Sequence, residues 1–395
     1  MEDRIAMNPV SPRPLARRTL LVIVALTAGA IASFAAVSRL VTRLKANEKR
    51  IAWHAYEAGL TEVRAGRPEL ALDDFRAALS YDRDNSEYQL SLARALRDTG
   101  RLDESEAYLL HLWNATPQDS TVNLALARLA VRRRSVDDAI RYYHSAIYGF
   151  WPNAPDQNRR QARFELIDFL LQRSAFPQAR AELIALAQGL TPDPEQHLKV
   201  AGLFVHAQDL PNALAQYQSA LKAEPRNAEA LAGAGSALFQ MGQYRSAQQY
   251  LQKAQNSNDP QVREQLQAAE AVLAADPFLG RLSDAERNRR IVAAFEHAGD
   301  RLKSCAQAKQ VDLPAGPLVS NSNGSGLDLA SLWSRWLSAK PQLRQLSAPT
   351  NIDMPDTLMD LVFEIEQRTA QQCGEGDRLD QALLRIVRDR ESVDQ

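Results

Sequence analysis

The sequence predicts an all-α protein that consists of an N-terminal transmembrane helix, an α-solenoid of about six repeats and a C-terminal helical domain. Three observations predict this architecture: an uncharged apolar run in residues 19–38, a 34-residue period in residues 52–260, and amphipathic helix patterns in residues 261–395. The remaining segments are a basic tail, residues 1–18, which we expect on the cytoplasmic side, and a juxtamembrane linker, residues 39–51.

The apolar run Thr19–Ser38 is twenty residues long, which is enough for an α-helix to cross the hydrocarbon core of a membrane. Arginine and lysine flank the run on both sides. A cleaved signal peptide is the competing interpretation, because Ser33–Ala35 resembles a small-x-small cleavage site. We favour an uncleaved anchor, since the apolar run is longer than the core of a usual signal peptide.

The charge distribution bears on orientation and on partners. Residues 1–50 hold nine Lys/Arg against three Asp/Glu, whereas the whole chain has a net charge of −1. Positive charge is similar on both flanks of the run, so it does not decide the orientation. A short basic tail before a first span commonly stays in the cytoplasm, so we expect the repeats in the periplasm or exterior. The chain has no strongly basic domain, which argues against nucleic acid as a partner.

The 34-residue period is visible when Gly59, Ala71, Phe75 and Ala78 are taken as one frame. In steps of 34 and 68 residues, small residues mostly fall on small ones and bulky residues on bulky ones: Ala93, Ser105, Leu109, Leu112, and then Ala127, Ala139, Tyr143, Ala146. A fixed period of this length is typical of a solenoid, in which each helix pair buries its apolar face against the next pair. The alternative, a generic alanine-rich helical bundle, does not predict this recurrence.

These residues resemble the tetratricopeptide-repeat (TPR) family over roughly residues 52–260. The sixth repeat is the best copy, with Leu231, Gly235, Gly242, Tyr244, Ala247, Leu251 and Ala254. The fourth repeat is degenerate and follows an insertion at about Asn153–Arg159. The small residues lie where the paired helices cross. The glycines Gly66, Gly100 and Gly242 lie at the turn between the helices, where a left-handed conformation carries no penalty for glycine.

Beyond the repeats, periodicity predicts further helices, and we recognise no family. The expected helices are 260–275, one from a capping box at 283–286 towards Lys309, 329–337, 354–372 and 378–388, with a loop at 311–327. The chain has two cysteines, Cys305 and Cys373, near the ends of two of these helices. We expect a disulfide between them, which suits an oxidising compartment. Free buried thiols are the alternative.

No motif points to catalysis. The six histidines form no His-Glu-x-x-His pair, and the chain has no phosphate-binding glycine loop, no Gly-x-Ser-x-Gly elbow and no dinucleotide fingerprint. We therefore expect no enzyme, cofactor, metal site or small-molecule substrate.

The resemblance implies that the first helix of each repeat lines a concave groove that binds proteins or peptides. The family's inward positions carry over to Trp53, Tyr56, Arg64, Arg94, Arg97, Arg128 and Arg132. Guanidinium groups along one wall can pair with the carboxylates of an acidic or C-terminal peptide. The alternative is that these arginines are solvated or form ion pairs within the solenoid.

The sequence thus predicts a membrane-anchored adaptor or scaffold in the cell envelope. Two alternatives remain at this stage. One is a periplasmic chaperone that holds exported clients, and the other is an enzyme sited in the C-terminal domain.

Overall fold

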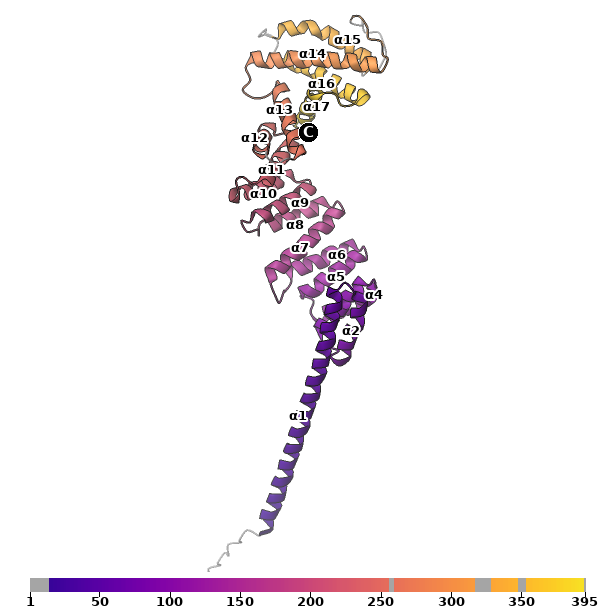
Figure 1. Ribbon diagram of the computed structural model, residues 1–395, viewed down its shortest axis with the longest axis vertical. Coiled ribbons are helices and arrows are strands. Elements are labelled where there is room, and N and C mark those ends of the chain that lie inside the picture. The colour runs from indigo at the N-terminus through magenta and orange to yellow at the C-terminus, as the bar shows by residue number, and fades with distance from the viewer. Residues whose placement is uncertain (1–13, 256–258, 317–327, 347–352, 394–395) are drawn as a thin grey trace, which may run out of the picture. The chain divides into compact units, whose positions relative to one another are not determined.

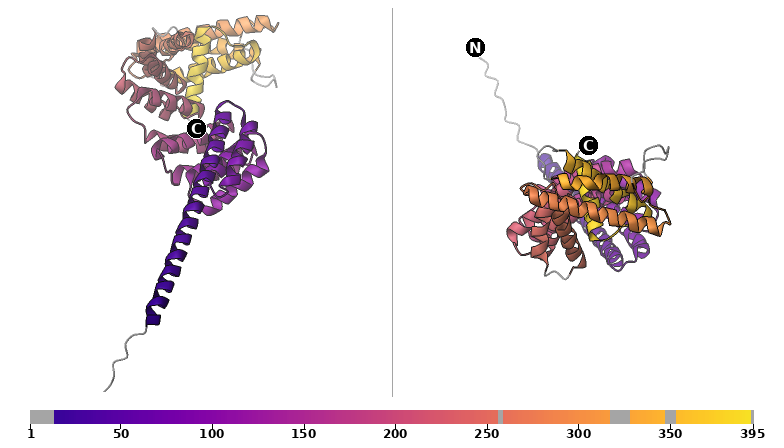
Figure 2. Two further views of the ribbon diagram at one scale, coloured as in Figure 1. Left: turned by 60° about the horizontal axis from the view of Figure 1, so that its bottom comes forward. Right: turned by 90° about the horizontal axis from the view of Figure 1, so that it is seen from above.

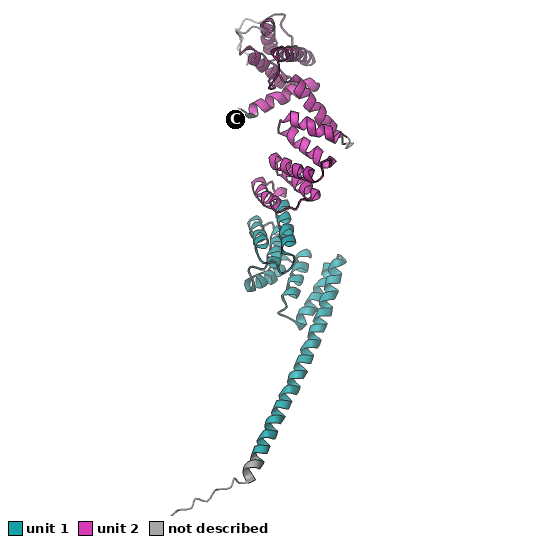
Figure 3. Cartoon of the chain, turned by 90° about the vertical axis from the view of Figure 1, so that its left-hand side faces the viewer, with its two compact units in different colours: residues 1–169 teal, residues 170–395 magenta. Residues whose placement is uncertain are grey.

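The computed structural model describes residues 14–255, 259–316, 328–346 and 353–393, and every secondary-structure element longer than an isolated bridge in these ranges is helical. The expected all-α fold is therefore confirmed. The chain forms two compact units, Met1–Phe169 and Leu170–Gln395 (Figure 3). Part of the predicted basic tail, residues 1–13, and part of the predicted loop, residues 317–327, lie outside the described residues.

Unit 1 is built from antiparallel helix pairs that follow one another along the chain (Figure 1). Its helices are α1 (Pro14–Arg64), α2 (Pro68–Tyr81), α3 (Ser86–Asp98), α4 (Leu102–Ala115), α5 (Ser120–Arg132), α6 (Val136–Tyr148) and α7 (Pro155–Gln172), which ends in unit 2. The pairs α1/α2, α3/α4 and α5/α6 each share extensive contacts, as the predicted repeats require.

Helix α1 is a single helix of 51 residues that contains both the apolar run and the first helix of repeat one. Its N-terminal part extends beyond the other helices of unit 1 (Figures 1 and 2). No proline interrupts the chain between Pro14 and Pro68, so nothing in the backbone breaks the helix. It is long and apolar enough to cross a membrane by length and composition. The segment that we expected as a linker, residues 39–51, is helical and continues the apolar helix directly into the repeats.

The turns inside the helix pairs repeat one backbone conformation, in steps of 34 residues except for the step of 40 across the insertion. Gly66, Gly100 and Gly242 have φ angles of 72°, 80° and 71°, as expected for the left-handed region. The equivalent turns elsewhere use residues with a side chain: Arg134 (φ 61°), Ser174 (φ 55°) and Gln208 (φ 57°). The repeat therefore fixes the backbone of the turn more strictly than the residue type.

The small residues at the helix crossings are required by packing. A Cβ atom added to Gly59 would lie 2.6 Å from the ring of Phe75, and one added to Gly235 would lie 2.7 Å from the side chain of Leu251. Ser105, which replaces the usual alanine, donates a hydrogen bond of 2.7 Å to the carbonyl oxygen of Ala93 and is fully buried. A small hydroxyl is therefore tolerated at this crossing because its polar atom has a partner.

Unit 2 contains the remaining helix pairs and the C-terminal helices. Its elements are α8 (Phe176–Ala187), α9 (Pro194–His206), α10 (Leu210–Ala223), α11 (Ala228–Gln240), α12 (Tyr244–Ala254), α13 (Pro260–Ala275), α14 (Asp284–Ala308), α15 (Leu329–Ala339), η1 (Lys340–Gln345), α16 (Met354–Cys373) and α17 (Arg378–Val393). Helix α14 begins at the predicted cap, where the Ser283 hydroxyl accepts a hydrogen bond from the backbone N–H of Glu286.

One hydrophobic core joins the last repeat to the C-terminal helices. It runs from Leu231 on α11 through α13 and α14 to Val387 on α17. Helix α13 packs on α12, as expected for a helix that covers the end of the solenoid, and α17 returns along the chain to pack on α13. The C-terminal helices therefore close the apolar end of the repeats, where a solenoid otherwise leaves a hydrophobic face exposed.

Candidate functional site

The residues expected to line the groove fall into three environments in unit 1. Trp53 is exposed on α1, with 48% of its surface accessible, and Arg64 and Arg132 are also exposed at the last turns of α1 and α5. Tyr56 is buried, with 4% of its surface accessible. Arg94 and Arg97 on α3 and Arg128 on α5 are part-buried. We refer to Arg94, Arg97 and Arg128 as the arginine wall.

Tyr56 is a core residue of the first repeats. Its ring lies 4.7 Å from the ring of Tyr88 and 5.8 Å from that of Phe75, measured between centroids. Its hydroxyl donates to Oε1 of Glu87 at 3.1 Å and lies 3.3 Å from Oγ of Ser91. Burial raises the pKa of this hydroxyl, so it stays protonated. Tyr56 therefore holds α1 against α3, and its ring is not open to a partner.

Arg128 is already paired within the unit. Its Nε donates to Oε2 of Glu165 at 2.8 Å, and its Nη2 donates to Oε1 at 2.7 Å. Burial alone would raise the pKa of Glu165, but the hydrogen bonds and charge of Arg128 outweigh it and lower that pKa. This two-pronged geometry is the strongest form of an arginine–carboxylate pair. Arg128 therefore forms an ion pair within the solenoid, which was the alternative interpretation of these arginines.

Arg94 is different because its charge is not matched. Among the residues that the structure describes, no acidic side chain forms an ion pair with it, and its buried Nε has no hydrogen-bond partner. Burial lowers its pKa, and the nearby charges of Arg128 and Arg97 lower it further. A guanidinium group cannot lose its proton at any ordinary pH. Arg94 on α3 is consequently a part-buried cation without a paired anion.

Arg97 lies one helical turn from Arg94, and its charge is matched by a neighbouring carboxylate. Its Nε and Nη2 pair with the neighbouring carboxylate of Asp98, with distances to Oδ1 of 2.8 Å and 2.7 Å. Its Nη1 is buried and has no hydrogen-bond partner within the described part of the chain. The wall thus contains two N–H groups that are buried and lack an acceptor, on side chains one helical turn apart, so a partner would meet the part-exposed remainder of each guanidinium group. Carboxylate oxygens are the acceptors that such donors fit best.

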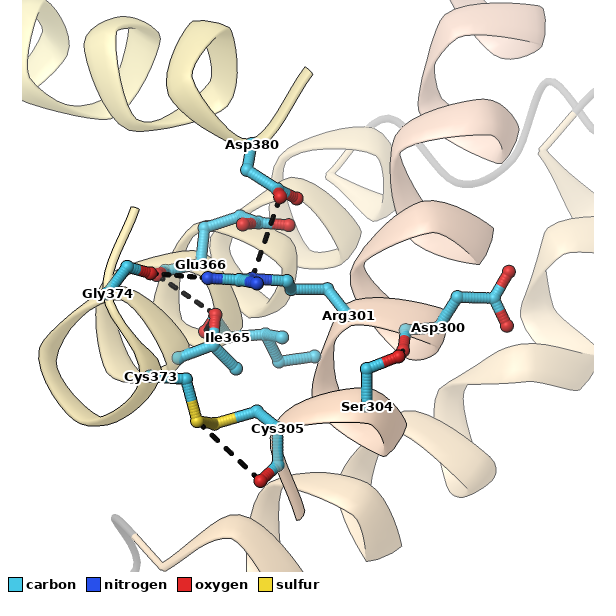
Figure 4. Close-up of a disulfide and its surroundings, with 10 residues drawn as sticks. Asp300, Arg301, Ser304, Cys305, Ile365, Glu366, Cys373, Gly374 and Asp380 are labelled. Carbon is cyan, nitrogen blue, oxygen red and sulfur yellow. Dashed lines mark hydrogen bonds and ion pairs between the residues drawn. A yellow bond between two sulfur atoms is a disulfide. The ribbon is translucent and has the colours of Figure 1, made fainter. Parts of the chain in front are cut away.

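A second polar cluster lies in unit 2, beside the two cysteines. A disulfide joins Cys305 at the end of α14 to Cys373 at the end of α16, and their Cα atoms are 5.8 Å apart (Figure 4). This separation is inside the limit of about 7 Å that a disulfide allows. One turn before Cys305, the guanidinium group of Arg301 donates to the carbonyl oxygen of Gly374 and lies 3.6 Å from Oδ2 of Asp380.

Asp380 is the centre of this cluster. It is buried, its Oδ1 lies 2.6 Å from Nε2 of His297, and its Oδ2 accepts the backbone N–H of Asp377 at 2.6 Å. Asp377 in turn accepts the backbone N–H of Asp380 at 3.1 Å, which completes a reciprocal cap on α17. Burial would raise the pKa of Asp380, but the His297 hydrogen bond and the cap keep it below the usual value. Asp380 therefore ties α17 to α14 as a carboxylate.

Glu366 faces the same cluster from α16 and has only 1% of its surface accessible. Neither carboxyl oxygen has a donor partner among the described residues. Burial, followed by the charge of Asp380, raises the pKa of Glu366 to about 8. A neutral carboxyl group is the form that this environment favours, because an ionised one would be buried beside Asp380 without a matching donor.

The cluster also contains a set of groups that metals use. Nε2 of His297 and carboxylate oxygens of Glu366 and Asp380 lie within 4.8 Å of one another. However, His297 and Asp380 are 2.6 Å apart, whereas two ligands of one tetrahedral zinc ion lie about 3.3 Å apart. The charge of Arg301 also opposes a cation here. We therefore interpret the cluster as a hydrogen-bonded network that holds α14, α16 and α17 together.

Family models of the tetratricopeptide repeat match residues 62–129, 124–194 and 204–273, just over half of the chain. The chain belongs to the tetratricopeptide-repeat family. TPR repeats bind proteins and peptides, so the chain is built as a protein-interaction adaptor or scaffold. The arginine wall lies within the matched residues, whereas the disulfide and its cluster lie beyond them.

Three solved structures resemble the TPR repeats of this chain. One is titled as the functional characterization of Pseudomonas aeruginosa pilF: 14% identity, 55% of this chain and 97% of that one, TM-score 0.38. A second is PilW, described as a widely conserved type IV pilus biogenesis factor. It is 16% identical, the match covers 54% of this chain and 97% of that one, and the TM-score is 0.36. A third is YrrB, described as a TPR protein with an unusual peptide-binding site: 17% identity, 50% and 97%, TM-score 0.37. No curated protein matches the chain.

The TPR frame explains which functional residues sequence reasoning missed. Glu165 follows the insertion after repeat three, which shifts the 34-residue count, so the frame did not pair it with Arg128. Glu366, His297 and Asp380 lie outside the repeats on three helices. The available signal was weak: an acidic residue within the apolar stripe of the helix at 354–373.

Proposed function

We propose that the protein is a single-pass adaptor in the cytoplasmic (inner) membrane whose TPR repeats bind an acidic protein or peptide segment outside the cytoplasm. The observation that carries the binding site is Arg94. It is a part-buried cation on the inward helix of repeat two with an unused buried N–H group. The carboxylate of a partner supplies the missing negative charge beside the part-exposed guanidinium group.

The contacts of the predicted groove residues favour some of them over others as partner contacts. Arg128 is neutralised by Glu165 and Tyr56 is enclosed, so neither is a primary contact. Arg94 is the anchor, Arg97 lies beside it with its charge shared with Asp98, and the exposed ring of Trp53 offers apolar surface on the preceding inward helix. Arg64 and Arg132 are placed to contact the flanks of a bound segment. The partner class that follows is an extended chain with carboxylates.

Anchoring and orientation are part of the proposal. Residues 19–38 form the span, 1–18 the cytoplasmic tail, 52–260 the solenoid and 261–395 the C-terminal helical domain. The apolar side chains of the span, such as Leu26 and Phe34, are mostly exposed and have no protein core to cover them. An alkaline-phosphatase fusion placed after Gln395 should be active. A fusion that is inactive while a cytoplasmic fluorescent reporter at the same point is active would reverse the orientation.

The binding site is tested by replacing Arg94. Partners are first recovered by affinity purification of the anchored protein in detergent and identified by mass spectrometry. Arg94→Ala should weaken their binding at least tenfold, because a hydrogen bond to a charged group contributes about 1.5–3 kcal/mol. Arg94→Lys should restore part of the affinity, since the charge returns without the planar donor pair.

The matched control is Arg141→Ala, which removes an exposed arginine from α6, the second helix of repeat three. Arg128→Ala is avoided as a test because it leaves the part-buried Glu165 unpaired and disturbs the fold. If Arg94→Ala stays helical by circular dichroism and recovers the same partners with the same salt dependence, the site is elsewhere. Recovery of many weakly held clients instead of a stoichiometric partner would identify a chaperone.

A further inference from the structure

Helix α1 uses only one of its faces for the solenoid. Ala52, Tyr56 and Gly59 are buried against the first repeats. A different face carries an apolar stripe that runs from the end of the proposed span towards the repeats, and we call Val37, Leu40, Leu44, Asn47 and Ile51 the seam. The apolar members of the seam are between 37% and 59% exposed. No element of the described chain covers them.

The spacing of the seam is that of a coiled coil. Its residues are separated by three, four, three and four positions, which is the 3.5-residue repeat of a and d positions. The face directly away from the seam is polar, with Thr42 and Lys49. Asn47 is the one polar member of the seam, and its side-chain oxygen accepts a hydrogen bond of 3.0 Å from Arg50 on the same helix. An amphipathic helix that faced only water would have no reason to keep this period.

Charges beside the seam are complementary in one arrangement. Arg43 precedes one seam position and Glu48 follows another, and they are five residues apart. In a parallel, in-register coiled coil, the residue just before an a position lies beside the residue five places later in the partner helix, just after a d position. Arg43 and Glu48 form no ion pair within the described chain. Pairing two copies would give two symmetric Arg43–Glu48 contacts.

These observations together indicate what packs on the seam. We propose that a second copy of this chain packs along the seam as a parallel, in-register coiled coil of α1. This rests on the proposed membrane anchor, because two copies inserted in the same direction emerge from the membrane parallel and at the same height. The same a and d spacing continues into the span as Ala30 and Ser33, whose small side chains permit close approach of spanning helices.

Oxidative cross-linking in native membranes tests the seam. Leu40→Cys and Leu44→Cys place thiols on the two-fold axis, where the Cα atoms of two copies lie within about 7 Å, the limit for a disulfide. Both should give a covalent dimer on a non-reducing gel, at least fivefold more than Thr42→Cys and Lys49→Cys on the outer face. The wild-type chain, whose own cysteines are bridged, sets the background. Equal yields at the four positions, or no dimer at any, would overturn the proposal.

Charge reversal tests the register. In the Leu44→Cys background, Arg43→Glu alone and Glu48→Arg alone should each reduce the dimer severalfold, because each places like charges opposite one another. The combined reversal should restore it. A combined variant that stays as weak as the single variants would rule out the parallel register.

Alkaline extraction combined with the cross-linking separates the coiled-coil proposal from the proposed membrane anchor. Extraction of the membranes at alkaline pH first shows whether the chain is embedded. If the chain is released, anchoring is wrong, and the cross-linking pattern of the released protein then decides the seam independently. If the chain is retained and the seam does not cross-link, the anchor stands and the coiled coil does not.

Discussion

Arg94 and Glu366 show how burial acts differently on the two signs of charge. Burial penalises the charged form of either side chain. A carboxyl group can respond by taking up a proton, and the pKa of Glu366 is accordingly raised to about 8. A guanidinium group cannot respond in this way, so Arg94 remains charged and its requirement for an anion persists. Glu366 can therefore relieve its burial by protonation, whereas Arg94 can do so only beside an anion, which is the basis of the proposed binding site.

The protonation of Glu366 makes unit 2 sensitive to pH. The folded pKa is about 8, against 4.5 for the ordinary side chain. Between these values the folded state binds the proton and the unfolded state does not, so the stabilising contribution is complete at acidic pH. It is lost as the pH rises towards 8. We expect the free energy of unfolding to fall by on the order of a few kcal/mol between pH 5 and 8.

Glu366→Gln should remove the part of this dependence that belongs to the carboxyl group, because the amide keeps the shape without the charge. Urea unfolding at a series of pH values, followed by circular dichroism, measures the effect. The groups that face Glu366 are His297 and Arg301 on α14, with Asp380 and Asp377 on and before α17. His297→Gln serves as the control for the imidazole, whose pKa is raised by the Asp380 hydrogen bond. A wild-type profile that is flat between pH 5 and 8 would contradict the buried neutral carboxyl.

At the scale of the elements, local sequence patterns predicted where most helices begin and end, but not which helices pack together. The helix expected at 260–275 has those limits in the structure, and the helix expected at 354–372 ends one residue later. Such limits follow from caps, prolines and periodicity, which are local. The separate span and linker expected in residues 19–51 are one helix, because a change from apolar to charged side chains does not interrupt backbone hydrogen bonds.

The candidate sites were predictable only as far as the repeat frame reaches. Arg94, Arg97 and Arg128 lie near enough for the charges of Arg97 and Arg128 to act on Arg94, as expected if equivalent positions of neighbouring repeats face the same side. The Arg128–Glu165 pair and the Glu366 cluster depend on tertiary packing across an insertion and across three helices. No periodicity carries that information.

The turns between paired helices give a prediction at the same scale. Gln208 adopts the left-handed backbone that Gly66 and Gly100 adopt in the corresponding turns. A side chain in this region costs about 1–2 kcal/mol, and glycine loses part of that gain to its greater freedom when unfolded. Gln208→Gly should therefore raise the free energy of unfolding by about 0.5–1 kcal/mol, measured by urea denaturation.

The reverse substitution is the matched control for the turns. Gly100→Ala should lower the free energy of unfolding by about 1 kcal/mol, because a Cβ atom there meets no neighbour within 4 Å and only the backbone conformation is penalised. If Gln208→Gly destabilises the protein, the turn residue has a side-chain role that outweighs its strain.

For the whole molecule, the features outside the repeats decide where it works. A TPR solenoid alone is compatible with any compartment. The apolar part of α1 is long enough to cross a membrane, and the Cys305–Cys373 disulfide suits an oxidising compartment; both support the proposed location. These two features are independent of each other, because one lies in the first residues of the chain and the other in the last hundred.

The disulfide supplies the prediction that tests this location. Closing a loop between residues 68 apart should stabilise the fold by about 4 kcal/mol in the chain-entropy model. Cys305→Ser with Cys373→Ser should lower the free energy of unfolding of unit 2 accordingly. In cells, both thiols should resist a membrane-permeant alkylating reagent until a reductant is added. Two thiols that react freely without reductant in the wild-type chain would place the C-terminal helices in a reducing compartment and so reverse the proposed orientation.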